Sequence, residues 1–253
     1  MTASLVVDAR LIGGRSIRKS SRNPASILGA IVFPLLFFAL FNIVMRRIME
    51  ARDFDYVQLL PSTIVVQAMI FSAMSSAYFV AEDRVTGITG RFRSMPVHPL
   101  SPILGRAVAD VARAFVSLTV VLTVGIIVGM RFNAGIGWLP VYVVVGLLFA
   151  LGMALVFGLL GYVVSTPEAA VSAASIPYLP LLMLSSGFVP VEDFPGWLQP
   201  FVEWQPVTAT IDALRALAGD GDIARDVTVA LAWSVGLIVV FGAIATRRVR
   251  SVA

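Results

Sequence analysis

The 253-residue sequence contains no cysteine and a single histidine, His98. The absence of cysteine excludes disulfide bonds, thiolate zinc sites, iron–sulfur clusters and cysteine nucleophiles. His98 lies among three prolines, with no second histidine to share a metal ion or to complete a catalytic triad. We therefore expect no catalytic residue, no metal site and no redox chemistry in this chain.

Charged residues are also scarce, at 13% of the chain, while hydrophobic residues make up 58%. This composition lies outside the soluble range, and a membrane-spanning helix needs about 20 mostly apolar residues. Six windows free of charge meet or approach that length, at residues 23–45, 56–81, 114–130, 132–167, 169–191 and 227–246. They predict an all-α membrane protein, a single domain of residues 1–253, with six transmembrane helices. Those helices are expected at residues 25–45, 56–80, 103–130, 138–164, 169–186 and 227–245.

The basic residues indicate how these helices are oriented. Placing the N-terminus in the cytoplasm puts 13 of the 19 basic residues inside, giving +8 inside and −4 outside. Cytoplasmic loops carry an excess of Lys and Arg, which explains a pI near 10 better than binding to nucleic acid does. We therefore expect both termini, including the tail 246–253, to be cytoplasmic. The first apolar stretch is longer than a signal-peptide core and should remain as the first helix.

Residues 1–24 contain Leu5, Ala9 and Ile12 at helical spacing beside several arginines. This pattern is typical of a short amphipathic helix on the inner membrane surface. We expect Gly13 and Gly14 to interrupt that helix.

The inner segment 81–102 alternates charges with single apolar residues, which is unusual for a simple loop. One interpretation is a solvated turn that its arginines keep in the cytoplasm. The other is a docking element, with Arg84, Arg91 and Arg93 around the apolar anchors Phe92 and Met95, because arginines and aromatics concentrate at interface hot spots. Both interpretations fit the sequence alone.

Three charges open the third predicted helix, Arg106, Asp110 and Arg113. Their i, i+4 and i+7 spacing places them on one face, where Asp110 could neutralise both arginines. Because the trio lies near a helix end, structural pairing is favoured over a proton relay. The fifth predicted helix contains Pro177 and Pro180, and we expect it to be loosened or broken there.

The outer segment 187–225 is too apolar for a solvated loop. We predict two short helices, about 195–203 and 208–218, that partly re-enter the outer leaflet. The second has an apolar stripe, Val207, Ile211, Leu214 and Ala218, and an Asp212–Arg215 pair at i, i+3 spacing.

Several motifs occur in an order and spacing that resemble the ABC-2 permease family. They are Arg22-Asn23-Pro24 before the first helix, Glu82-Asp83-Arg84-x-x-Gly87 followed by Pro96-Val97, and Ser186-Gly187-Phe188-x-Pro190 continuing through Pro195-x-Trp197, Pro206, Asp212 and Arg215. The resemblance covers nearly the whole chain and is greatest to daunorubicin-resistance-type drug and lipid exporters of actinobacteria.

The resemblance implies a permease of the bacterial plasma membrane that dimerises with a second copy or a paralogue. It also implies two separate ATPase subunits, which would bind ATP and Mg, since this chain itself is expected to hold no cofactor. Amphipathic cargo would move outward between the two permease halves.

By the same resemblance, residues 1–24 form a connecting helix that includes Arg18, Arg22 and Pro24, and residues 81–102 form the coupling loop. The ATPase-coupling residues would be Glu82, Asp83, Arg84, Gly87, Arg91, Phe92 and Pro96. The extracellular gate would be formed by Gly187, Phe188, Pro190, Pro195, Trp197, Pro206, Asp212 and Arg215. Arg91 stands where many relatives carry an acid, which puts the ATPase contact there in question.

The spans offer apolar surface with scattered polar residues and no charge near a span centre, which favours amphipathic or lipid-like cargo. Phe33, Phe37, Phe41 and Gln67 could line its path, although such phenylalanines also commonly pack against lipid or neighbouring helices. An ion-coupled or proton-coupled transporter would need an acid or histidine at mid-membrane and internal repeats, and neither is present. An intramembrane enzyme would need a catalytic pair at membrane depth. A membrane scaffold without transport activity remains an alternative.

Overall fold

The computed structural model describes residues 5–22, 24–50, 56–88, 90, 100–219 and 221–251. Arg91, Phe92, Pro96 and His98 lie outside these residues. In the described part of the chain every regular element is a helix. The helices are α1 (Leu5–Ser21), α2 (Pro24–Glu50), α3 (Tyr56–Val85), α5 (Ser101–Val128), α6 (Leu139–Leu160), α7 (Pro167–Met183), α8 (Gln199–Trp204), α9 (Pro206–Ala218) and α10 (Ile223–Ser251), with short 3₁₀ turns η1 (Ile136–Trp138) and η2 (Val191–Asp193).

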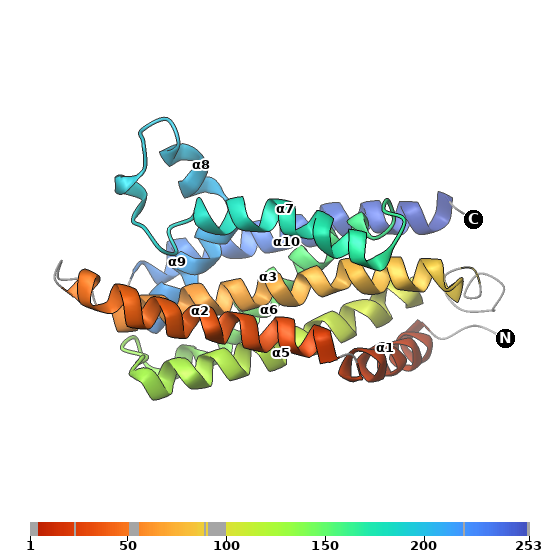
Figure 1. Cartoon of the computed structure of the whole chain (residues 1–253), viewed down its shortest axis with the longest axis horizontal. Helices are drawn as coiled ribbons and strands as arrows, with labels where there is room; N and C mark the ends of the chain where they lie inside the picture. Colours follow the sequence, from red (N-terminus) through yellow and green to blue (C-terminus); the bar gives the residue numbers. More distant parts are fainter. Residues whose placement is uncertain are drawn as a thin grey trace.

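The long helices run side by side along the longest axis of the molecule (Figure 1). Four are long and apolar enough to cross a membrane among the described residues: Val57–Val85, Ser101–Val128, Ile136–Leu160 and Ile223–Arg248. α2 contributes a shorter apolar stretch, Ile31–Val44. At a rise of about 1.5 Å per residue, the 17 residues of α7 reach about 25 Å. The all-helical membrane class is thus confirmed, and six crossings remain a prediction.

The two ends of the bundle differ. The start of α1, the end of α3, the turn between α6 and α7, and the end of α10 gather at one end, which we call the α1 end (Figure 1). α8, α9 and η2 lie at the opposite end, the α8 end, where α8 projects sideways from the bundle. The first and last described residues therefore lie at the same end, as expected for two termini on one side of a membrane.

α3 forms the centre of the core. Most of its residues between Leu60 and Ala81 are buried, and it packs against α2, α5, α6, α7 and α9. Small residues after α6 allow close approach: a Cβ on Gly161 would lie 2.5 Å from the carbonyl oxygen of Ala77. Helices in membranes commonly pack through such small residues because they bring the backbones close together.

Two expectations about helix breaks were wrong. α1 continues through Gly13 and Gly14, because Gly13 packs directly against Gly105 of α5 and this contact stabilises the helix. α7 also runs unbroken through Pro177 and Pro180. Each proline removes only one helical hydrogen bond, and the stripe that α7 buries against α3 holds the remaining turns in place.

Candidate functional site

Asp83, in the last turns of α3, is the centre of a charged cluster at the α1 end. Its side chain accepts hydrogen bonds from Lys19 Nζ of α1 and from Arg106 Nη2 of α5, both at 2.8 Å. Arg15 of α1 lies 3.7 Å away, and Glu82 lies 2.8 Å from the same Lys19 Nζ. Asp83 is only 6% exposed. One carboxylate therefore ties α1 and α5 to the end of α3.

The pairing predicted within α5 is partly wrong. Arg106 bonds Asp83 rather than Asp110, because the end of α3 places a carboxylate directly opposite it. Asp110 pairs with Arg113 and accepts a 3.1 Å hydrogen bond from Ser76 Oγ of α3. The charges of α5 thus serve to join helices more than to pair along their own face.

A second set of contacts fastens α1. The ring of Phe79 on α3 lies 5.6 Å from Lys19 Nζ and 5.0 Å from the Arg113 guanidinium, so cations from α1 and α5 both face it. Where α1 crosses α5, a Cβ on Gly105 would lie 2.9 Å from the backbone nitrogen of Gly13. Only glycine allows so close a crossing.

The face of α1 that turns away from α5 is mixed in character. Val7 and Leu11 are exposed there, Leu11 by 69%, beside exposed Arg10, Arg18 and Arg22. Arg18 and Arg22, predicted as connecting-helix residues, thus lie outside the Asp83 cluster. Pro24 is the first residue of α2.

Arg84 points into the protein rather than away from it. Both of its terminal nitrogens donate to backbone carbonyls of the turn between α6 and α7, those of Tyr162 and Val164. Gly87, with a φ of +70°, then closes the turn that ends α3, where its backbone N–H donates to the carbonyl of Arg84. Asp83, Arg84 and Gly87, all predicted as coupling residues, therefore form a scaffold at the α1 end, where α3 ends.

A second polar cluster lies at the α8 end, around Arg215 of α9. The Arg215 side chain donates to the carbonyls of Ser186 and Gly187 at 2.9 Å and to Thr63 Oγ1 of α3 at 3.1 Å. Ser186 Oγ donates to Asp212 at 2.7 Å, and Asp212 lies 4.0 Å from Arg215. The predicted Asp212–Arg215 pair is present. It also holds the turn that follows α7, which sequence spacing could not show.

Burial raises the pKa of Asp212 above its ordinary value, and the hydrogen bond from Ser186 and the charge of Arg215 lower it in part. Gly187 fits where no side chain could, since a Cβ there would lie 2.7 Å from Thr63 Cγ2. Gln205 donates to the carbonyl of Leu184. No sequence motif marks Thr63 or Gln205 as functional, although each is a polar residue in an apolar setting.

The other residues predicted to form a gate are spread over the α8 end. Pro190 precedes η2, Pro195 opens the turn before α8, and Pro206 is the first residue of α9. α8 begins later than predicted, at Gln199, whereas α9 matches its predicted range closely. Trp197 is 81% exposed, so it does not take part in the Arg215 cluster.

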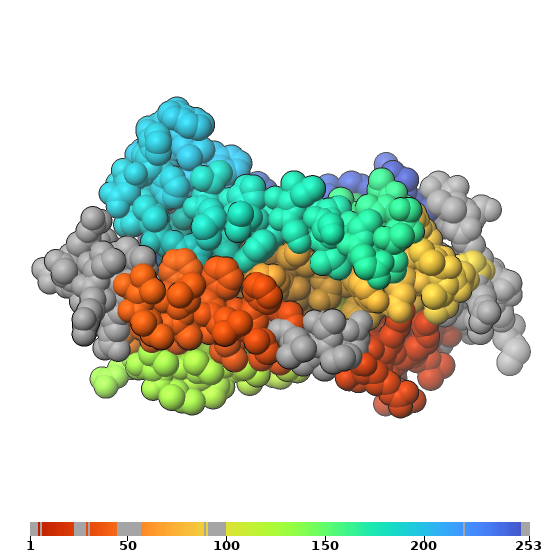
Figure 2. All heavy atoms as spheres, viewed as in Figure 1, coloured from red at the N-terminus to blue at the C-terminus, as the bar shows by residue number. Residues whose placement is uncertain are grey.

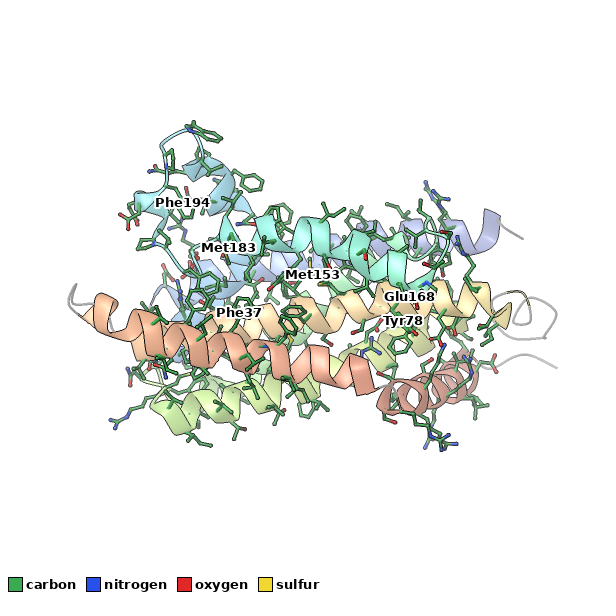
Figure 3. All side chains as sticks on the ribbon, in the orientation of Figure 1. Phe37, Tyr78, Met153, Glu168, Met183 and Phe194 are labelled. Atoms are coloured by element: carbon green, nitrogen blue, oxygen red, sulfur yellow. The ribbon has the colours of Figure 1, made fainter. Side chains whose placement is uncertain are left out.

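Aromatic rings form a ladder along α2. Successive centroids lie 6.3 Å apart from Phe33 to Phe37, 6.0 Å from Phe37 to Phe41 and 4.4 Å from Phe41 to Phe188. Phe37, labelled in Figure 3, is the middle ring on α2. The predicted path residues on α2 therefore continue directly to a predicted gate residue.

A branch of this ladder leads to α3 and α7. Phe33 lies 5.4 Å from Phe71, and Phe71 lies 4.8 Å from Tyr178 of α7. Gln67 is fully buried and donates to the Tyr178 hydroxyl at 2.9 Å, while its Oε1 has no hydrogen-bond partner among the described residues. α3 reaches the surface between α2 and α7 on this face of the molecule (Figure 2).

Comparison with known proteins gives consistent results. The sequence model of the ABC-2 type transporter family matches residues 8–218. The probable doxorubicin resistance ABC transporter permease protein DrrC of Mycobacterium tuberculosis is 30% identical over 241 residues, which cover 93% of this chain and 85% of the relative. The daunorubicin resistance ABC transporter permease protein DrrB1 of Streptomyces coeruleorubidus is 27% identical, over 90% of this chain and 81% of its own. The putative transport permease ycf38 of Cyanophora paradoxa is 22% identical, over 78% and 69%.

Proposed function

Because the chain belongs to the ABC-2 type transporter family, we propose that it is the permease subunit of an ATP-binding cassette exporter. Amphipathic drug-like or lipid-like cargo would leave the cytoplasm or inner leaflet, driven by two separate ATPase subunits that bind ATP and Mg. The observation that carries the proposal is the match over 93% of the chain to a relative named as a doxorubicin resistance permease.

We place six crossings in the membrane: α2, α3, α5, α6, α7 and α10. α1 would lie in the inner interface, because its outward face combines Leu11 with arginines that can reach headgroups. The α1 end would face the cytoplasm of a bacterium, with both termini there. α8 and α9 would re-enter the outer leaflet, where the exposed Trp197 suits the aromatic belt.

The absence of native cysteine makes this topology directly testable. Val85→Cys at the α1 end and Trp197→Cys at the α8 end both replace exposed side chains. In intact cells, an impermeant maleimide should label the Trp197→Cys variant, and it should label the Val85→Cys variant only after permeabilisation. Labelling of the Val85→Cys variant from outside would overturn the orientation.

The coupling segment, residues 81–102, would dock against the ATPase. Asp83 and Arg84 support this proposal as positioning residues, because their bonds to α1, α5 and the α6–α7 turn fix the start of the segment. Glu82 and Gly87 would shape that start. Arg91, Phe92 and Pro96 would contact the ATPase directly.

Copurification tests the docking proposal. The native complex should contain an ATPase subunit, and the double variant Glu82→Ala with Arg84→Ala should insert normally but lose cargo-stimulated ATP hydrolysis. Glu203 and Arg225, an exposed pair 3.9 Å apart at the α8 end, provide a matched control, and replacing both by alanine should leave hydrolysis unchanged. Transport driven by a proton gradient with no ATPase would instead identify a secondary transporter.

We also propose the aromatic ladder as the cargo path. Phe33, Phe37 and Phe41 form a series of neighbouring rings against which flat amphipathic molecules can pack. The Oε1 atom of Gln67 is buried and has no partner among the described residues, so it would accept a hydrogen bond from cargo only in a conformation that opens the contact with Tyr178. Phe188 connects this path to the extracellular gate. A dimer with a second copy or a paralogue would enclose it.

Doxorubicin is a suitable probe, since relatives are named for resistance to it. Phe33→Ala should reduce doxorubicin-stimulated ATP hydrolysis several-fold without changing basal hydrolysis. Phe115 on α5 lies outside the ladder and is 49% exposed, against 51% for Phe33, so Phe115→Ala is the matched control and should have no such effect. Equal losses in both variants would show that the ladder only packs against lipid.

A further inference from the structure

α7 is fastened at its inner end by one arginine. The two terminal nitrogens of Arg84 donate to the carbonyls of Tyr162 and Val164, in the turn that leads into α7. Gly161, at the start of that turn, lies against the backbone of α3, since a Cβ there would be 2.5 Å from the Ala77 carbonyl. The end of α3 and the start of α7 are therefore joined by both side-chain and backbone contacts.

The outer end of α7 is fastened in the same way. Arg215 donates to the carbonyls of Ser186 and Gly187, in the turn that follows α7, each at 2.9 Å. Thr63 Oγ1 donates to the same Gly187 carbonyl at 2.9 Å. At both ends one planar guanidinium holds two peptide carbonyls, a geometry that the single ammonium of lysine cannot reproduce.

Between these two fastenings α7 makes a narrow contact. Its buried residues are Ala170, Ala174, Tyr178 and Leu182, one every four residues, and they form a single stripe against α3. Two of the four are alanines, which give a smooth contact surface. The Tyr178–Gln67 hydrogen bond is the polar contact in this stretch. Because α7 is fastened at both ends and contacts α3 along one narrow stripe, a displacement of one end can reach the other along the helix.

We propose that α7 relays movement of the coupling segment to the outer turn 184–188, and that Arg84 and Arg215 are the positioning residues that attach its two ends. This inference rests on the proposed function, because the movement originates in a bound ATPase. Arg84 lies three residues before Gly87, so displacement of the coupling segment pulls on the turn before α7. At the far end, Arg215 passes that displacement to α9.

The test measures movement at the outer turn in the complete complex. Val189→Cys introduces the only thiol into the chain, one residue beyond the last ring of the ladder. The permease–ATPase complex is placed in lipid nanodiscs and labelled with a maleimide, without nucleotide and with ATP plus vanadate. The ratio of the two labelling rates is compared in chains that also carry Arg84→Lys, Arg215→Lys, both, or the control Arg247→Lys on α10. Each ratio compares two labelling rates of the same variant, so a general loss of stability affects both rates and cancels in the ratio.

We expect nucleotide to change the labelling rate several-fold in the parent and in Arg247→Lys, and to change it little in Arg84→Lys or in Arg215→Lys. The double variant should show no greater loss than either single one, because two links in series fail together. Three outcomes would overturn the relay and leave the exporter proposal standing. The first is a ratio of labelling rates in Arg84→Lys or Arg215→Lys equal to that of the parent, and the second is additive reductions of that ratio in the double variant. The third is a parent whose labelling rate at residue 189 does not respond to nucleotide although its ATP hydrolysis is coupled to cargo. Failure of any ATPase to accompany the parent chain would refute the exporter proposal, and the relay with it.

Discussion

Asp83→Asn is the most direct test of the scaffold at the α1 end. The substitution keeps the shape of the side chain and removes its charge, so Lys19 and Arg106 lose the carboxylate that they share at 2.8 Å. An asparagine can accept from one of them, but its NH₂ group then faces the other. Lys19 retains Glu82 at 2.8 Å. Arg106 therefore bears most of the loss.

The loss of stability expected for Asp83→Asn depends on how deeply the cluster around Asp83 is buried. Removing one member of a buried ion pair costs about 3–5 kcal/mol, and an exposed pair contributes about 0–1 kcal/mol. Asp83 keeps 8% of its side chain exposed, while Arg15, Lys19 and Arg106 keep 40%, 25% and 21%. The cluster lies between the two limits, and we expect a loss of about 2–3 kcal/mol. For a chain of this size, at about 2–4 °C per kcal/mol, that corresponds to a fall in melting temperature of about 4–12 °C.

Thermal unfolding of the purified protein, followed by intrinsic tryptophan fluorescence, measures this loss. Asp193→Asn is the matched control, because Asp193 is exposed in η2 at the α8 end and the charge change is the same. Its melting temperature should be that of the parent. Equal melting temperatures for Asp83→Asn and the control would refute the conclusion that Asp83 joins α1 and α5 to α3.

Three further outcomes are expected. Gly105→Ala should destabilise the protein by about 1–3 kcal/mol, because its Cβ would meet the backbone of α1; Gly236→Ala, in open space on α10, should be neutral or stabilising by up to about 1 kcal/mol. Because the pKa of Asp212 is raised, the folded protein holds a proton that the unfolded chain has released at pH values between 3.8 and the raised pKa. The contribution of this carboxyl to stability therefore declines as pH rises through that interval. Melting curves across acid pH should show this decline in the parent and not in Asp212→Asn. Phe188→Ala removes the ring 4.4 Å from Phe41 and should lower doxorubicin-stimulated hydrolysis, whereas an unchanged response would exclude Phe188 from the path.

Local pattern was sufficient to predict where the long helices lie, but not that α1 and α7 continue without a break. Long charge-free runs located the four helices that are long enough to cross a membrane. The apolar stripe of α9 at Val207, Ile211, Leu214 and Ala218 is buried together with most of that helix. The i, i+3 spacing of Asp212 and Arg215 gave their pairing, because neighbours on a helix face depend only on the helix itself.

Contacts between distant segments were not predictable in the same way. Arg106 has Asp110 one turn away in its own helix and yet bonds Asp83, because packing of α3 on α5 places that carboxylate nearer. Arg84 looked like an exposed docking charge, but the turn after α6 supplies two carbonyls to it. Phe41 and Phe188 are separated by more than half of the chain and share no local signal. Positions of this kind depend on tertiary packing, which a single sequence does not encode in any short pattern.

The inward direction of Asp83 has a consequence for constructing hybrid permeases. A segment exchanged between two relatives to change their choice of ATPase would carry Asp83 with it and leave Lys19 and Arg106 behind in the host. Where the host carries other residues at the positions of Lys19 and Arg106, the hybrid would fail through a mismatched scaffold even if its new contact surface were correct. Exchanges that move α1, residues 81–102 and the first turns of α5 together should retain their partner preference.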